Sequence, residues 1–131
     1  MLSIRNNMAC AGKITPPQFV AAAFDTLFPE AVNVEWHPNA QGFEAVFHLN
    51  QCEMITMLDA NGQLLELRRN LPAAEAPDVV KVALAPGAEL MNVIRVEKTE
   101  VTYEIIYRNS RLDRFVMLIN ENGNILSDSA L

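Results

Sequence analysis

The sequence predicts an α+β fold in which two similar halves each supply one helix followed by a four-stranded antiparallel meander. Two turns of the same kind, at residues 58–64 and 119–125, lie at corresponding places in the halves. Each has Asp or Asn at its second position, whose side chain can accept a backbone hydrogen bond, and glycine at its fifth, which can take a left-handed conformation. Apolar β-formers flank both turns, so each is expected to join two strands of a hairpin. The helices are expected to pack on one face of the sheet.

The first helix is predicted over residues 18–28. Thr15 has the side chain of a helix N-cap, and Pro16 and Pro17 suit a first turn, where a missing N–H costs nothing. Pro29 ends the helix. Apolar residues at three- and four-residue spacing form a stripe that must pack on a sheet: Val20, Ala23, Phe24, Leu27 and Phe28.

Alternation of apolar and polar residues predicts four strands after this helix. Val32, Val34 and Trp36, for example, alternate with polar neighbours. The predicted strands cover residues 32–37, 43–49, 52–58 and 63–67, with a loop at 38–42 and a short turn at 50–51.

The second half follows the same plan after a linker at residues 70–76. A shorter helix is predicted over residues 77–85, where Pro86 and Gly87 end it. The predicted strands lie near residues 92–98, 101–108, 112–119 and 124–128. We therefore expect a flexible lead-in over residues 1–14 and a single domain over 15–131, with repeats at about 15–69 and 77–131.

Composition excludes several classes of protein. Half of the 131 residues are hydrophobic, enough for a core, and ten basic residues against sixteen acidic ones give a net charge of −6. This charge disfavours nucleic acid and anionic membranes as partners, because both recruit clustered Lys and Arg. No apolar run approaches the roughly 20 residues of a membrane span.

The order of several short motifs resembles the β-lactamase-inhibitor-like, PepSY-like family of bacterial secreted proteins. The resemblance covers about residues 15–131, with the second half weaker, and rests on residues 17–24, 28–31, 34–36, 42–47 and 58–62. It implies a tandem α+β repeat and a periplasmic or secreted location. It implies no catalytic residue, and structural likeness to an inhibitor does not by itself assign an inhibitory role.

Residues 1–13 lack the apolar core of about 7–15 residues that marks a secretory signal. We expect a periplasmic or secreted protein whose leader has been removed, or a cytoplasmic one if the chain is complete. The predicted function is a non-enzymatic protein-binding module of the bacterial envelope, of which an inhibitor-like module is one form. The alternative is a small-molecule-binding or catalytic α+β cone of the nuclear-transport-factor-like type, which a buried cavity containing Trp36 and a carboxylate would indicate.

No set of side chains predicts a catalytic, cofactor or metal site. His37 and His48 lie on different strands without a ligand at metal spacing, and Cys10 and Cys52 belong to no metal motif. A disulfide between these cysteines cannot be argued from their spacing. Trp36 is expected in the core.

Both faces of the predicted strands carry apolar residues. If one face packs under the helices, the strand period of two sends a second aliphatic set to the helix-free face. This set consists of Val46, Ile55, Met57, Ile106, Val116 and Leu118, within a rim formed by Glu44, His48, Glu53, Glu104, Arg108 and Arg114. Because a patch of roughly 300–600 Å² often marks an interface, we expect a protein partner or a second copy to bind there. The alternative is that residues 1–14 or the linker cover it.

Overall fold

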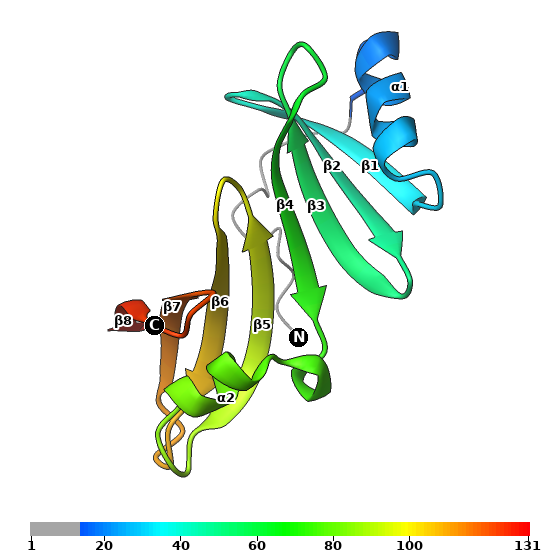
Figure 1. The fold of residues 1–131 in the computed structure, drawn as a ribbon. Helices are drawn as coiled ribbons and strands as arrows, with labels where there is room; N and C mark the ends of the chain where they lie inside the picture. Colours follow the sequence, from blue (N-terminus) through cyan, green and yellow to red (C-terminus); the bar gives the residue numbers. More distant parts are fainter. Residues whose placement is uncertain (1–13) are drawn as a thin grey trace. The chain divides into compact units, whose positions relative to one another are not determined.

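The computed structural model describes residues 14–131, so the expected lead-in falls almost entirely outside the described residues. The protein is mostly β: it has an eight-stranded antiparallel sheet and two short α-helices (Figure 1). The strands follow one another across the sheet in chain order, from β1 to β8. Their bounds are β1 (Val32–Asn39), β2 (Gly42–Leu49), β3 (Cys52–Leu58), β4 (Leu64–Leu71), β5 (Glu89–Glu97), β6 (Val101–Arg108), β7 (Arg114–Asn120) and β8 (Ile125–Ala130).

The predicted α+β tandem repeat of a helix and a four-stranded meander is therefore wrong. Helix α1 (Gln18–Leu27) has ten residues, but α2 (Asp78–Ala83) has only six, with prolines at 77 and 86 on either side. The expected linker is largely structured, because β4 continues through Leu71 and a 3-10 turn, η2 (Ala73–Glu75), follows it. The prolines on either side of α2 keep this helix short, because proline cannot continue a helix. Strands therefore make up most of the structure.

The first helix begins later than its predicted cap. Pro17 occupies the N-cap position and no side chain caps the helix, so the prediction that Thr15 is the N-cap is wrong. The Pro17 carbonyl accepts hydrogen bonds from the N–H groups of Val20 (3.0 Å) and Ala21 (3.1 Å). A fixed proline φ close to the helical value lets the chain enter the helix at this residue without a polar cap.

The described chain divides into two compact units, one ending at Arg69 and the other comprising Asn70–Leu131. In the N-terminal unit, α1 places Val20 and Phe24 against β2 and β3. The Phe24 ring lies 5.0 Å from the Phe47 ring and 5.2 Å from the Trp36 ring, both in edge-to-face geometry. Trp36 thus belongs to the core, as predicted. The buried residues of this core are Val20, Phe24, Ala45, Phe47, Met54 and Leu58.

The C-terminal unit has its own core. Val80 of α2 is fully buried, and Ala76 beside it is nearly so. They pack on side chains of β5, β6 and β7, namely Val93, Tyr103, Ile105, Tyr107, Met117 and Ile119. Each helix therefore covers one face of the strands in its own unit.

The two predicted turns have the expected conformation. Gly62 and Gly123 have φ of 80° and 89°, and the side chains of Asp59 and Asn120 accept backbone hydrogen bonds within their turns. Each glycine also lies close to the helix of its own unit. A Cβ added at Gly62 would lie 3.2 Å from the Cβ of Ala23, and one at Gly123 would lie 3.5 Å from the Cβ of Val79.

Candidate interaction face

The strand register places three of the six candidate residues together in the N-terminal unit. Val46 of β2 lies directly opposite Ile55 of β3, and Met57 lies opposite Glu44. Their sequence neighbours Ala45 and Phe47 pack under α1, so the pleat directs this second set to the other face. Val46 and Ile55 are only 7% and 4% exposed, and Met57 is half-buried.

Charged and polar residues border this aliphatic group in the neighbouring strands. His37 of β1 lies opposite Glu44, and its Nε2 atom is 3.3 Å from Oε1 of Glu35. On the other side, Arg68 of β4 lies opposite Ile55 and forms an ion pair with Glu66 at 3.5 Å. The face thus has an aliphatic centre with polar and charged residues beside it.

The other three candidates lie together in the C-terminal unit. Ile106 of β6 is opposite Val116 of β7, and Leu118 is opposite Glu104. All three aliphatic side chains are half-buried. Their neighbours Ile105 and Met117 belong to the core under α2, so this group also lies on the helix-free face.

The structure adds two residues to this face that the sequence analysis did not assign to it. Ile94 and Val96 of β5 lie opposite Glu104 and Thr102, and they are 7% and 4% exposed. The sequence does contain a sign of this placement, because Ile94 and Val96 alternate with Val93 and Arg95, as residues on opposite faces of a strand do. A register shift in β5 between Leu90 and Asn92 makes the face of each residue hard to assign before the pairing is known.

The six predicted residues therefore form two groups, one in each unit. Neither group contains a set of side chains with evident reactive chemistry. Val46 and Ile55 are themselves buried, so the apolar surface that a partner could contact comes from the half-buried side chains Met57, Ile106, Val116 and Leu118.

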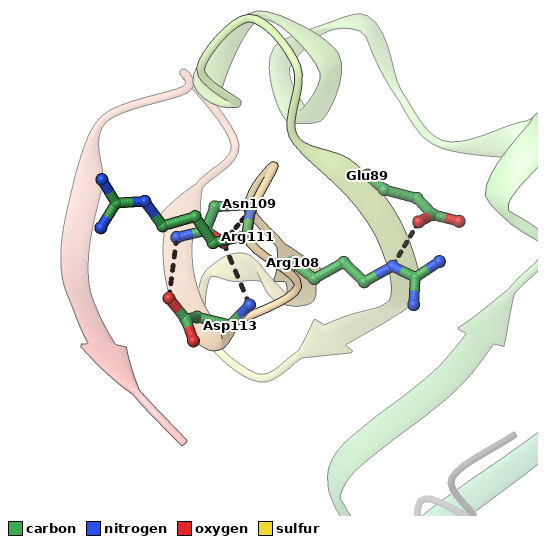
Figure 2. A network of polar contacts seen from close by, with 5 residues as sticks. All are labelled: Glu89, Arg108, Asn109, Arg111 and Asp113. Atoms are coloured by element: carbon green, nitrogen blue, oxygen red, sulfur yellow. Dashed lines mark hydrogen bonds and ion pairs between the residues drawn. The ribbon is translucent and has the colours of Figure 1, made fainter.

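A polar network stabilises the hairpin that joins β6 and β7 (Figure 2). The Asn109 side chain accepts hydrogen bonds from the N–H groups of Arg111 (2.9 Å) and Asp113 (3.0 Å), and its amide lies 3.4 Å from the Asp113 carboxylate. Arg108 forms an ion pair with Glu89 of β5. This is a third turn of the kind predicted at residues 58–64 and 119–125. It was missed because Leu112 occupies the glycine position.

The histidines and Cys52 are separated by the fold. His37 is buried in β1, His48 lies opposite Glu53, and Cys52 is a half-buried free thiol at the start of β3. Across residues 14–131 there is no group of three His, Cys, Asp or Glu side chains placed to hold a metal ion. Cys10 lies outside the described residues.

The surface of the described residues has hollows that a small ligand could enter. One of about 320 Å³ lies between two loops of the C-terminal unit and is lined by Thr99, Glu100, Val101, Asn120, Glu121 and Asn122. The other, of about 90 Å³, lies beside Cys52 and Met54. Trp36 lines neither of them, and its ring packs against Phe24 instead. No helix within the described residues is long and apolar enough to cross a membrane.

Comparison with known proteins gives the fold. The chain matches no protein-family model and no curated relative. Among solved structures it is similar to a DUF2874 family protein from Bacteroides uniformis, with a TM-score of 0.78, 21% identity, and coverage of 88% of this chain and 90% of the other. A BLIP-like protein from Bacteroides fragilis has a TM-score of 0.76 and 18% identity, with 92% and 89% covered.

A third similar structure is a protein from Bacteroides eggerthii assigned provisionally to the periplasm. Its TM-score is 0.78 at 16% identity, with 89% of this chain and 90% of the other covered. These likenesses show that the chain shares the fold of BLIP-like proteins, as the resemblance to β-lactamase-inhibitor-like proteins implied. The PepSY-like part of that resemblance stays a prediction.

Proposed function

We propose that the protein is a non-enzymatic protein-binding module of the bacterial envelope that binds its partner through the helix-free faces of its strands. The observation that carries this proposal is the second aliphatic set on strands whose other face already packs under a helix. Val46 faces Ile55 in one unit, and Ile106 faces Val116 in the other. An antiparallel sheet with one face in water normally shows polar residues on that face. The aliphatic pairs on the helix-free faces of this protein are therefore explained by contact with a partner.

The charged residues around these pairs support a protein partner. Glu44 and Glu104 occupy matching places, each opposite a long apolar side chain, Met57 or Leu118. An aliphatic centre within a polar rim is the usual composition of a protein interface. The fold shared with a BLIP-like protein and with a protein assigned provisionally to the periplasm supports an envelope location. An inhibitor-like action is one form that this binding can take.

The proposal is tested by replacing Met57 and Leu118 together with lysine. Both side chains are half-buried, so each lysine can extend its ammonium group to water while its charge opposes an apolar partner surface. We expect partners captured from envelope extracts by the unmodified protein to be lost, with an unchanged far-ultraviolet circular dichroism spectrum. The matched control is Val82→Lys, on an α2 side chain that is 84% exposed, and it should retain them.

Unfolding of the double variant would show that these faces are core, and the proposal would then be wrong. Retention of every captured partner by a folded double variant would also contradict it. Single Met57→Lys and Leu118→Lys variants show which unit carries the contact.

A further inference from the structure

The last strand of the sheet, β8, has an open outer edge. It pairs with β7 on one side and ends the strand order, so no other strand within residues 14–131 follows it (Figure 1). All six residues of Ile125–Ala130 are exposed, and Ile125 and Leu126 are 53% and 54% exposed. Such an edge presents a row of backbone N–H and C=O groups to any approaching strand.

The hydrogen-bond pattern identifies the groups that point outward. The N–H of Leu131 donates to the Arg114 carbonyl at 3.0 Å, so the N–H of Leu131 points toward β7. Antiparallel strands alternate between inward and outward backbone groups at successive residues. The backbone groups of Ser127 and Ser129 therefore point toward β7, and those of Asp128 and Ala130 point to the open side.

The opposite end of the sheet is protected, whereas β8 is not. In β1, Asn33 has a φ of 56° within an irregular register, Pro38 lacks an N–H, and the Trp36 carbonyl already accepts a hydrogen bond from Ile14 at 2.9 Å. Bulges, proline and covering segments are the features that prevent strand addition. β8 contains no proline or lysine, and its register shift lies at its first residues.

The one charge in β8 is already engaged. Both carboxylate oxygens of Asp128 lie 2.9 Å from the hydroxyl of Tyr107 in β6. This contact holds the Asp128 carboxylate against its own sheet. The carboxylate therefore does little to repel a strand that approaches the outer edge. Ile125 and Leu126 add apolar surface that such a strand would cover.

We propose that two copies of this chain associate by antiparallel pairing of their β8 strands about a two-fold axis. A second copy carries the same open edge, and pairing like edges closes the assembly as a dimer. Pairing of β8 with the protected β1 edge, which would build an open filament, is disfavoured. A register centred on Ser127 places Asp128 of one copy opposite Leu126 of the other, whereas one centred on Asp128 would oppose two carboxylates.

The test measures the mass of the full chain in solution from micromolar to millimolar concentration, by analytical ultracentrifugation. We expect a monomer–dimer equilibrium for the unmodified protein. Leu126→Glu should raise the dimer dissociation constant by at least about tenfold, because it places a second carboxylate directly opposite Asp128 of the other copy, and like charges across paired strands are destabilising. The matched control is Leu65→Glu, at the second residue of β4, which corresponds to Leu126 in β8 but lies in a strand that does not end the sheet. It should leave the dissociation constant unchanged.

A backbone variant separates strand pairing from apolar contact. Ala130→Pro removes an outward N–H and leaves the inward bonds to β7 intact, so it should weaken the dimer while the circular dichroism spectrum stays the same. A protein that remains monomeric up to millimolar concentration overturns the inference. So does a dimer that survives both Leu126→Glu and Ala130→Pro.

The Met57→Lys and Leu118→Lys double variant keeps this inference distinct from the proposed function. It should still dimerise, since neither residue lies in β8. A dimer lost in that variant but retained in the two β8 variants would place self-association on the helix-free face and overturn pairing at the edge.

Discussion

Leu112 occupies a turn position that two corresponding turns give to glycine. In the turns that begin at Asp59, Asn109 and Asn120, the first residue accepts hydrogen bonds on its side chain from the residues two and four places on. The fourth residue has positive φ in each: 80° at Gly62, 68° at Leu112 and 89° at Gly123. A side chain in the left-handed region costs about 1–2 kcal/mol, and Asn109 holds Leu112 there.

Replacing Leu112 with glycine is expected to stabilise the protein by about 0.5–1 kcal/mol, because relief of strain exceeds the extra freedom of glycine in the unfolded chain. Leu112 is 64% exposed, so little apolar contact is lost. The free energy of unfolding from urea titration measures the effect. Leu112→Ala keeps the strain and should change little. A glycine variant less stable than the unmodified protein would show that the leucine side chain packs.

The glycines should differ in their tolerance of alanine according to what surrounds them. Gly62→Ala and Gly123→Ala should each destabilise the fold by roughly 1 kcal/mol or more, since both have positive φ. Gly42→Ala should cost most, because its Cβ would lie 2.3 Å from the Leu58 carbonyl oxygen. Urea titration of the three variants provides the measurement. An unchanged free energy of unfolding in the Gly62→Ala and Gly123→Ala variants would contradict the prediction that these turns require glycine.

At the scale of the element, β8 is held by its ladder to β7 and by one side-chain contact. The hydroxyl of Tyr107 reaches Asp128 from two strands away, and the Tyr107 ring stacks on Phe115 at 5.2 Å. Burial and the hydrogen bond to Asp128 raise the pKa of Tyr107 above its ordinary value of 10.0. The neutral phenol is thus favoured in the folded protein.

Tyr107→Phe is expected to lower the free energy of unfolding by about 1 kcal/mol, the usual net contribution of a hydrogen bond. A raised pKa stabilises the folded state fully below the unfolded value of 10.0, and that contribution is lost as pH rises through the folded pKa. The difference in stability between the two proteins should therefore be constant at neutral pH and shrink above about pH 10. Hydrogen exchange of β8 amides should also accelerate in the variant. A difference that grows above pH 10 would contradict this assignment.

For the molecule as a whole, we expect stability to be independent of transition metals. His37 is 2% exposed and contacts Glu35, and the described residues supply no three-ligand group. Zinc or nickel in modest excess should leave Tm unchanged and leave no metal on the purified protein, as measured by differential scanning fluorimetry and elemental analysis. A metal bound at His37 or His48, and lost on replacing that histidine with glutamine, would contradict the prediction.

The sequence by itself determined the features that depend on local periodicity and turn chemistry. The stripe of Val20 and Phe24, the alternation around Phe47 and Ile105, and the glycines at 62 and 123 indicated which segments form helices, strands and turns. The faces of β2 and β3 followed as well, since Val46 and Ile55 must point away from Ala45 and Thr56. These properties follow from 3.6-residue and two-residue periods, which side chains reveal directly.

The tertiary structure alone decided that the strands of both halves form one eight-stranded sheet and which edge of that sheet is left open. Backbone N–H and C=O groups are the same at almost every residue, so the sequence does not state which strands pair across the chain. That is why an α+β tandem repeat was predicted where the protein has an eight-stranded sheet. The bond between Tyr107 and Asp128 and the exposed edge of β8 depend on those pairings. Tyr107 and Asp128, for example, are 21 residues apart in the chain and meet only because β6, β7 and β8 lie side by side.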